Sequence, residues 1–338
     1  HRARIGRGGA PPPPAGPLPG RRGIRVTSEL PGTRRTTITV GTFDGIHRGH
    51  QAVLAEIVRR AREAGRAAVL VTFDPHPLEI VAPGRAPALL TVADERRLLW
   101  PLFGLDYVHV VRFTEAVREM PPEVFVRDIL VRRLRVGELV IGYDHGFGKD
   151  RSGNVDVLRR LGAEIGFAVD VVGPVEVDSE PVSSSRVRRS VEAADFASAE
   201  RGLGRPYSAL GRVERGAGRG RGLGFPTANV HLEDARKCLP PDGVYAVRVE
   251  LDGVLHDGMA NLGARPTFGD TARGLEAHLF DWNGDALYGA RPLVEFVARL
   301  RSTVRFEGPE QLAEQLERDR RAALETLEGS RKTSGGVV

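Results

Sequence analysis

The sequence predicts two folded units, an α/β unit with a parallel, doubly wound sheet followed by a small β-barrel. With 338 residues, the chain is long for one compact domain. In its first half, short β-branched runs alternate with helical runs, which is typical of a parallel sheet covered by helices. After about Gly204 the strand-like runs continue without helical periodicity, until one helical segment near the end.

Five runs in the first half predict buried parallel strands. They cover residues 36–40, 67–73, 106–113, 138–142 and 167–173. The segments between them carry apolar residues at helical spacing, over 50–65, 93–104, 121–134 and 154–162. Ligands of doubly wound sheets bind beyond the carboxyl ends of the strands, so we expect a site in the loops that follow these strands.

The second half predicts a barrel and a helix that packs on it. Strand-like runs separated by Gly, Asp and Pro turns cover 207–216, 242–253, 254–263, 275–282 and 291–301. Residues 308–329 then place Leu312, Leu316, Ala323 and Leu327 near helical spacing. The predicted domains are therefore 36–203 and 204–330, between an Arg-, Pro- and Gly-rich extension at 1–35, predicted to be disordered, and a flexible tail at 331–338.

The positive charge of the chain lies in its first 35 residues. They hold eight Arg and one acid, Glu29, so their formal charge is +7, and residues 36–338 sum to −2 against +5 for the whole chain. A protein that follows a polyanion needs a basic body. The charge therefore argues against a general nucleic-acid binder and leaves an RNA-associated tail as the alternative.

Cysteine use and hydropathy set the expected compartment. Cys238 is the only cysteine, which excludes an internal disulfide and fits a reducing, cytoplasmic environment. No apolar run approaches the roughly 18 residues of a membrane helix, so we expect no membrane partner. The extension at 1–35 is Arg-rich, as transit peptides are, but its prolines prevent an amphipathic helix, so we expect no targeting role.

The segment "GTFDGIHRGH", residues 41–50, joins a predicted strand to a predicted helix. His47 and His50 lie three apart and therefore on one face of the helix N-terminus. The free N–H groups and the positive dipole end at this position favour an anion such as phosphate. A zinc site would need further ligands, and no Cys/His cluster accompanies the pair. Two ordinary surface histidines in a turn remain the structural alternative.

Eight motifs in order give the chain a specific resemblance. They are "GTFDGIHRGH", "VTFDPHP", "GYDHGFGKDRSGN", "VSSSRVR", "GRGRGLGFPTAN", "DGVYAVRV", "NLGARPTFG" and "LEAHLFD". Together, from about Thr36 to Leu327, they resemble bacterial bifunctional riboflavin kinase/FAD synthetases. The resemblance implies a Rossmann-like nucleotidyltransferase domain and a riboflavin kinase barrel of Greek-key type with a C-terminal helix. It implies riboflavin, FMN and ATP as substrates and Mg²⁺ as cofactor.

The implied chemistry has two steps. The barrel would phosphorylate riboflavin to FMN, and the first domain would transfer AMP from ATP to FMN, giving FAD and pyrophosphate. His47 and His50 would contact the ATP phosphates and stabilise the charge on the leaving pyrophosphate. The other residues that the resemblance assigns to ATP or phosphate in the first domain are Gly41, Thr42, Phe43, Asp44, Gly49, Ser184, Ser185 and Arg188.

Further residues would bind flavin or line a site. The resemblance suggests Asp74, His76, Asp144, Phe147, Arg151 and Arg301. Read from the residues alone, "FDPHP" could be a turn stiffened by proline, and "VSSSRVR" a helix cap followed by a basic face. The chain departs from the family pattern at Ser185, usually Thr, and at His145, where the family has Phe after Asp or Asn. The second departure leaves the ligand contacts of that loop open.

In the barrel, the resemblance assigns a base, a metal site and a nucleotide loop. Glu276 would accept the proton of the riboflavin 5′-hydroxyl. Thr227 and Asn229 are two apart, share one strand face and could hold Mg²⁺ through hard oxygen atoms, or be ordinary polar residues on a wet face. The implied nucleotide-binding residues are Gly218, Arg219, Gly220 and Asn261. Two alternatives keep the fold: an enzyme with one silent site, and a flavin-binding regulator without turnover.

Overall fold

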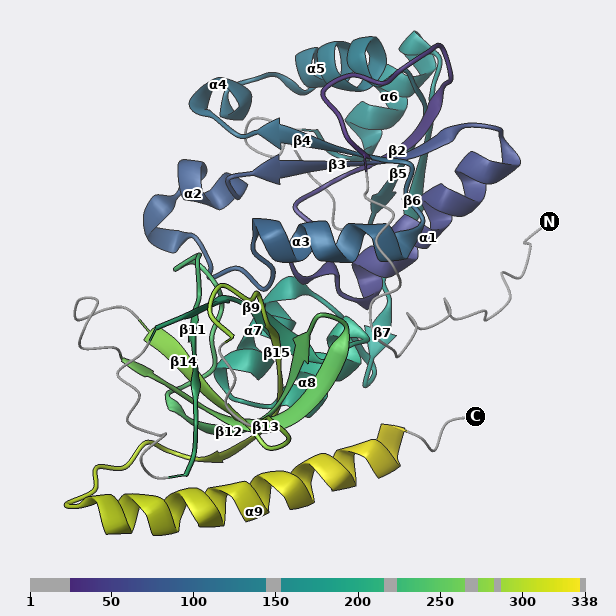
Figure 1. Cartoon of the computed structure of the whole chain (residues 1–338). Helices are drawn as coiled ribbons and strands as arrows, with labels where there is room; N and C mark the ends of the chain where they lie inside the picture. The colour runs from purple at the N-terminus through teal and green to yellow at the C-terminus, as the bar shows by residue number, and fades with distance from the viewer. Residues whose placement is uncertain (1–24, 144–152, 216–223, 265–272, 283–286, 335–338) are drawn as a thin grey trace. The chain divides into compact units, whose positions relative to one another are not determined.

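The computed structural model describes residues 25–143, 153–215, 224–264, 273–282 and 287–334 (Figure 1). Contacts divide these residues into two compact units. The first lies within Gly20–Pro87 and Arg96–Ser184, and the second within Ala88–Glu95 and Ser185–Val338. The chain therefore contributes one short segment to the second unit before it completes the first.

A six-stranded sheet forms the centre of the first unit. Its strands are β1 (Arg25–Val26), β2 (Thr36–Val40), β3 (Ala67–Asp74), β4 (Tyr107–Arg112), β5 (Val136–Gly142) and β6 (Ala168–Val172). They lie in the order β1-β4-β3-β2-β5-β6, and every neighbouring pair is parallel. The predicted doubly wound sheet is confirmed, with its five expected strands as β2 to β6. The order reverses between β2 and β5, so the crevice beyond their carboxyl ends is the expected ligand position.

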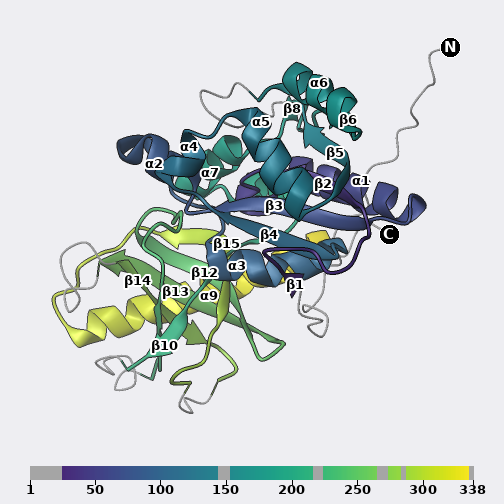
Figure 2. The same ribbon diagram turned by 90° about the horizontal axis from the view of Figure 1, so that it is seen from above.

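Helical segments cover both faces of this sheet (Figure 2). The longer ones are α1 (Arg48–Glu63), α3 (Ala93–Leu99) with η3 (Trp100–Phe103), α5 (Pro122–Phe125) with the π-helical η4 (Val126–Arg133), and α6 (Val155–Ile165). One apolar cluster joins α1 and Trp100 to alternate strand residues such as Leu70. The other joins η4 and α6 to Ile38 and Val69. The short segments are η1 (Asp44–Ile46), α2 (Pro77–Val81), η2 (Pro83–Arg85) and α4 (Glu115–Arg118), and β7 (Glu176–Val177) pairs with β8 (Glu180–Pro181).

The prediction of disorder does not hold for residues 25–35. Strand β1 pairs in parallel with the start of β4. Leu30 is only 7% exposed and belongs to a core cluster, and Arg135 donates a hydrogen bond to the Leu30 carbonyl. The apolar side chain and the backbone pairing fix this stretch, whereas residues 1–24 lie outside the described residues.

The second unit is an antiparallel sheet of seven strands. They are β9 (Tyr207–Leu210), β10 (Arg212–Glu214), β11 (Ala228–His231), β12 (Gly243–Leu251), β13 (Val254–Ala264), β14 (Arg273–Leu279) and β15 (Leu293–Arg301). Their order is β10-β11-β14-β13-β12-β15-β9. Strands β12, β13 and β14 follow one another, and β11 returns beside β14, which is a Greek key. The predicted barrel class is confirmed.

Gly211 joins the two edges of this sheet, because β9 and β10 are consecutive in the chain. A Cβ at Gly211 would lie 2.4 Å from Cγ1 of Val230 and 2.6 Å from the His231 carbonyl oxygen. Only glycine therefore lets the chain pass from β9, beside β15, to β10, beside β11. This step curls the sheet back on itself.

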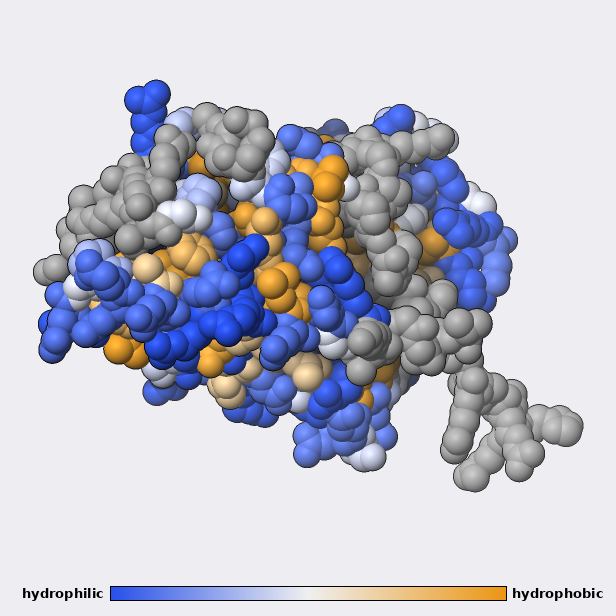
Figure 3. All heavy atoms as spheres, turned by 60° about the horizontal axis from the view of Figure 1, so that its bottom comes forward, coloured by the Kyte–Doolittle hydropathy of each residue, from blue (hydrophilic) through white to orange (hydrophobic). Residues whose placement is uncertain are grey.

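Helix α9 (Pro309–Ser334) packs on the barrel as predicted. Its Ala323 and Leu327 are fully buried against Ala246 and Met259. Arg248 donates hydrogen bonds to the Leu327 carbonyl and the Ser330 hydroxyl. The helix continues to Ser334, so the first four residues of the predicted flexible tail are helical. In Figure 3, the surface on the side of α9 is mostly hydrophilic, with small apolar patches between the charged side chains.

The segment Ala88–Glu95 is fastened to the second unit by a buried ion pair. Nζ of Lys237 lies 2.7 Å from Oε2 of Glu95, and the two side chains are 3% and 5% exposed. The same ammonium donates to the Leu90 carbonyl, and the Leu210 N–H donates to Oε1 of Glu95.

Two helices, α7 (Ser184–Glu192) and α8 (Phe196–Leu203), precede the first strand of the barrel in the chain. The ring of Phe196 in α8 stacks on that of Phe296 in β15, with their centroids 5.5 Å apart.

The free energy of unfolding of the second unit is expected to fall as the pH rises from 4.5 to about 7. Burial raises the pKa of Glu295 from 4.5 to about 7, although Arg248 opposes this effect. Because the folded state binds the proton more tightly than the unfolded state, the stabilisation is complete below 4.5 and is lost as the pH passes 7. The loss amounts to about 3 kcal/mol.

Glu295→Gln should remove this pH dependence, as measured by urea unfolding at pH 5 and pH 8. Glu328→Gln, on the exposed side of α9, is the matched control and should keep it. An unchanged pH dependence in Glu295→Gln would contradict the assignment to this buried carboxyl group.

Candidate functional site

The loop after β2 has an unusual backbone. Phe43 and Ile46 have φ angles of 50° and 41°, and Gly45 has a φ of 79°. A left-handed conformation at bulky residues costs about 1–3 kcal/mol each and persists only where the surroundings enforce it. This loop lies at the carboxyl end of β2, the strand at which the order of the sheet reverses. The backbone strain therefore coincides with the expected ligand position.

His47 and His50 lie together at the start of α1, as their spacing predicted. His47 is the N-cap residue, and its Nδ1 accepts a hydrogen bond from the His50 N–H at 3.4 Å. The two rings stack with their centroids 3.7 Å apart, and the Phe43 ring lies 4.7 Å from that of His50. A Cβ at Gly49 would lie 3.2 Å from Nδ1 and Cε1 of His47, so glycine leaves room for this ring.

The environment of His50 favours an uncharged imidazole. Nδ1 of His50 is buried and has no hydrogen-bond partner among the described residues. Burial lowers the pKa of His50 well below 6.5, and the neighbouring His47 lowers it further. A neutral ring at a helix N-terminus meets an anion through a hydrogen bond and the helix dipole instead of a formal charge.

The serine motif begins a helix beside this loop. Ser184 is the first residue of α7, and its hydroxyl donates to the Asp44 carbonyl at 2.9 Å. Oγ of Ser185 accepts a hydrogen bond from Nη1 of Arg188 at 3.4 Å. The Ser184 hydroxyl, which the sequence assigned to phosphate, therefore has a partner within the protein. At the other end of the loop, a Cβ at Gly41 would approach Cε2 of Phe43 to 3.0 Å.

Asp74 and His76 both have structural partners. Oδ1 of Asp74 accepts from Nη2 of Arg96 at 3.3 Å. His76 caps α2, because its Nδ1 accepts from the Leu78 N–H at 3.2 Å and its own N–H donates to Oε1 of Glu79 at 2.9 Å. This capping box is the structural alternative to a role in the site. The candidates Asp144, Phe147 and Arg151 lie outside the described residues.

In the barrel, three candidate residues lie in one row across the sheet. Glu276 on β14 pairs with Asn229 on β11 and with Asn261 on β13. Residues directly opposite in antiparallel strands share a face and lie about 5 Å apart. The exposed Glu276 carboxylate is therefore flanked by two half-buried amides. Thr227, also half-buried, lies one residue before β11.

The same row contains Glu214, which the sequence analysis did not single out, and Arg301, which it expected to bind flavin or line a site. Glu214 on β10 pairs with Asn229, which places a second carboxylate in the row. At the other end, Arg301 faces Val244 of β12, itself the partner of Asn261. Alternation along "GRVERG" gives the face of Glu214, but the sequence does not give its register against Asn229.

Arg301 is held by α9. Its Nη2 lies 2.6 Å from Oδ2 of Asp319, and Nε donates to Oδ1 at 2.8 Å. Asp319 is 4% exposed and also accepts a hydrogen bond from Gln315. The Arg301 guanidinium thus forms an ion pair that joins the barrel to α9. Asp319 is a second residue that the sequence did not single out. The loop candidates Gly218, Arg219 and Gly220 lie outside the described residues.

The barrel candidates offer oxygen atoms to a metal ion. Within the part of the chain that the structure describes, no group of three or more His, Cys, Asp or Glu side chains is placed to hold a metal. The hydroxyl of Thr227 and the amide oxygen of Asn229 are hard donors, which suit Mg²⁺ better than zinc.

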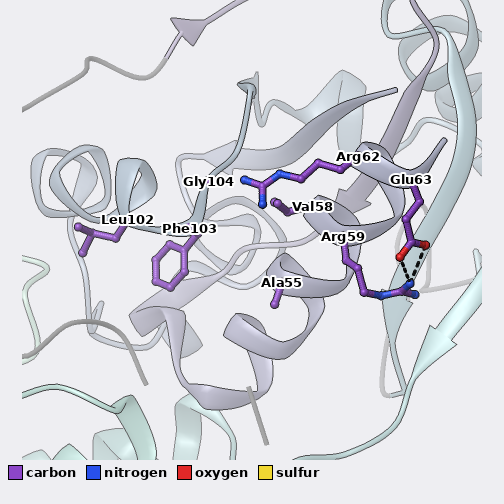
Figure 4. Close-up of a pocket in the computed structure, with 8 residues that line it drawn as sticks. All are labelled: Ala55, Val58, Arg59, Arg62, Glu63, Leu102, Phe103 and Gly104. Atoms are coloured by element: carbon purple, nitrogen blue, oxygen red, sulfur yellow. Dashed lines mark hydrogen bonds and ion pairs between the residues drawn. The ribbon is translucent and has the colours of Figure 1, made fainter. Parts of the chain in front are cut away.

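A separate pocket of about 510 Å³ lies along the C-terminal half of α1 (Figure 4). Residues between Ala55 and Glu63 form one wall, and Leu102, Phe103 and Gly104 form the other. The Arg59 guanidinium is paired with Glu63 at 2.7 Å. His50, in the first turn of α1, is not among the lining residues, so this pocket is distinct from the histidine site.

Comparison with known proteins identifies both halves of the chain. Residues 30–186 match the family of FAD synthetases, and residues 203–327 match that of riboflavin kinases. Among the described residues, no helix has the length and apolar character needed to cross a membrane.

Relatives named bifunctional riboflavin kinase/FMN adenylyltransferase cover most of the chain. The protein from Pseudomonas fluorescens is 43% identical over 294 residues, 87% of this chain and 93% of its own length. That from Escherichia coli K12 is 37% identical over 305 residues, with 90% and 96% covered. That from Bacillus subtilis is 33% identical over 303 residues, with 88% and 94% covered.

A solved structure shares the fold over both halves. The crystal structure described as a macrolide-efflux protein from Streptococcus pneumoniae is 30% identical, with a TM-score of 0.74 over 85% of this chain and 93% of that one. The description applies to that protein. With both family matches and the named relatives agreeing, this chain belongs to the bifunctional riboflavin kinase/FMN adenylyltransferase family and carries an FAD synthetase domain followed by a riboflavin kinase domain.

Proposed function

We propose that the two activities of the family are carried out at the two clusters described above, in domains 36–203 and 204–330. The barrel phosphorylates riboflavin at the row of Asn229, Glu276 and Asn261, and the first domain adenylylates FMN at His47 and His50. The observation that carries the proposal is the row itself, since one exposed carboxylate between two amides is an arrangement that can orient a hydroxyl group.

In the kinase reaction, Glu276 accepts the proton of the riboflavin 5′-hydroxyl as that oxygen attacks the γ-phosphorus of ATP. Asn261 lies beside it on β13 and donates its amide N–H to a phosphate oxygen. The flavin and the phosphates are thereby aligned for in-line transfer, in which positioning supplies most of the rate.

Thr227 and Asn229 are the residues that would hold Mg²⁺. Both present oxygen donors, and Asn229 lies directly beside Glu276, which supports the fit. Mg²⁺ bound there would neutralise charge on the transferred phosphoryl group. The side-chain amide of Asn229 also orients the Glu276 carboxylate.

In the adenylylation reaction, the FMN phosphate attacks the α-phosphorus of ATP and pyrophosphate leaves. His50 donates a hydrogen bond to the phosphate oxygens, and the N-terminus of α1 adds its dipole. The low pKa of His50 supports a role as hydrogen-bond donor.

A time course tests this assignment. The purified protein is incubated with riboflavin, ATP and Mg²⁺, and the flavins are separated by chromatography. FMN should appear first and then convert to FAD. FMN without FAD would overturn the adenylylation half, and no product from a folded protein would favour a flavin-binding regulator.

The partners and location follow from this chemistry as proposals. Both reactions consume ATP, which supports a cytoplasmic location. The near-neutral balance of residues 36–338 supports a protein without a nucleic-acid or membrane partner. Cell fractionation and an RNA-binding measurement with and without residues 1–35 test these two statements.

A further inference from the structure

Three side chains from outside the strained loop hold three alternate carbonyl groups of that loop. The hydroxyl of Thr72 donates to the Thr42 carbonyl at 3.2 Å. The Ser184 hydroxyl donates to the Asp44 carbonyl at 2.9 Å, and Nε2 of Gln51 donates to the Ile46 carbonyl at 2.9 Å. The carbonyl groups that accept these hydrogen bonds belong to residues 42, 44 and 46. Phe43 and Gly45, which lie between them, have left-handed backbone conformations, and so does Ile46.

Each donor comes from a rigid element next to the loop. Val71 of β3 is paired with Val40 of β2, so Thr72 lies beside the point where β2 ends and the loop begins. Gln51 is in the first turn of α1 and reaches back over the N-cap. Ser184 begins α7. Thr72 and Gln51 are 1% and 8% exposed, so their bonds are shielded from water.

These bonds affect both the shape of the loop and its electrostatics. A bulky residue with a φ near 50° is unfavourable by itself, so the loop keeps this conformation only if other bonds enforce it. A carbonyl oxygen that accepts a buried bond is turned into the protein, and its partial negative charge is directed away from a bound anion. The loop ends at His47, which stacks on His50, so its conformation sets the position of both rings.

We propose that Thr72, Gln51 and Ser184 are positioning residues for adenylylation. They hold residues 42–46 in the conformation that presents His47 and His50 to the phosphates of ATP, without touching ATP themselves. This inference rests on the proposed function of the histidine site. The carbonyl groups are pre-arranged before ATP binds, so the enzyme does not need to reorganise the loop during the reaction.

Thr72→Val is the variant that isolates this effect, because it keeps the shape of the side chain and removes the hydroxyl. It leaves the Thr42 carbonyl without its donor, and kcat for FAD formation from FMN should fall about tenfold, the usual weight of one buried hydrogen bond. Thr72→Ser keeps the hydroxyl and should restore kcat to within about twofold of wild type. KM for ATP should change less than kcat, since the loss lies in alignment.

Thr37→Val is the matched control. Thr37 is also a fully buried threonine of this sheet, and its hydroxyl has no hydrogen-bond partner among the described residues. Its replacement should leave kcat unchanged. The riboflavin kinase activity of the same preparations, which depends on the other domain, normalises the amount of protein, and Thr37→Val controls for the stability of the first domain. Gln51→Met provides a second, independent variant with the same expected loss in kcat.

The outcomes separate this inference from the proposed function. If wild type forms FAD, and Thr72→Val and Gln51→Met remain within about twofold of it, the positioning role is overturned while the adenylylation site stands. If Thr37→Val loses as much as Thr72→Val, the effect is general destabilisation and the inference is likewise overturned. If wild type forms no FAD, the proposed function itself fails. A tenfold loss restored by Thr72→Ser, with the control unchanged, supports the inference.

Discussion

Replacing Glu276 by Gln is expected to lower kcat of riboflavin phosphorylation by about 10³-fold, the usual weight of a general base. The substitution keeps the shape of the side chain and its place between Asn229 and Asn261, but it removes the group that accepts the hydroxyl proton. Riboflavin binding should change little. The measurement is FMN formation at saturating riboflavin and ATP, with FAD formation from supplied FMN used to normalise the amount of protein.

Glu214→Gln is the matched control for this prediction. Glu214 lies in the same row on the other side of Asn229, so it is a carboxylate of the same face at a similar distance from the proposed metal ligand. Only Glu276 lies between the two amides, so we expect Glu214→Gln to retain most of the kinase activity. If Glu214→Gln is inactive and Glu276→Gln is active, Glu214 is the base and our assignment is wrong.

The fold could be predicted well because its signals are local. Five β-branched runs, separated by segments with helical spacing, predicted the strands β2 to β6. The order of the strands in the sheet then places the ligand crevice at the end of β2. His47 and His50 were found because three residues are nearly one helical turn, which brings their rings together. Glu276 and Asn229 were both named, and the strand register adds that they are direct neighbours.

Features that depend on distant partners could not be predicted. Arg301 was named as a flavin-binding or site-lining residue on the family resemblance, and nothing in the sequence pairs it with Asp319, 18 residues away on a helix. Histidine is a residue type that often occurs in binding sites. In the structure, however, His76 and Glu79 form the capping box at the start of α2. The supporting bonds of Thr72 and Gln51 depend on the register of β3 against β2 and on the backbone of the loop, which residue spacing does not encode.

Replacing His50 by Ala is expected to lower kcat of FMN adenylylation by about 10²- to 10³-fold, the weight of one donor to a developing oxyanion. Riboflavin kinase activity, measured in the same preparation, should be unchanged. His50 is a cleaner target than His47, because His47 also caps α1 and its loss would cost helix stability. His47→Asn, which keeps a capping side chain, is therefore the companion variant.

The electrostatics of the pair give this prediction a second test. Because burial lowers the pKa of His50, its ring is neutral at pH 7 and becomes charged only at a pH well below 6.5. Wild-type adenylylation should therefore not fall between pH 7 and 8 through loss of a proton from His50. His50→Gln, which offers an uncharged donor, should recover part of the activity that His50→Ala loses. If His50→Gln is as inactive as His50→Ala and the wild-type rate falls steeply above pH 7, the ring acts as a cation, and our assignment of a neutral hydrogen-bond donor is wrong.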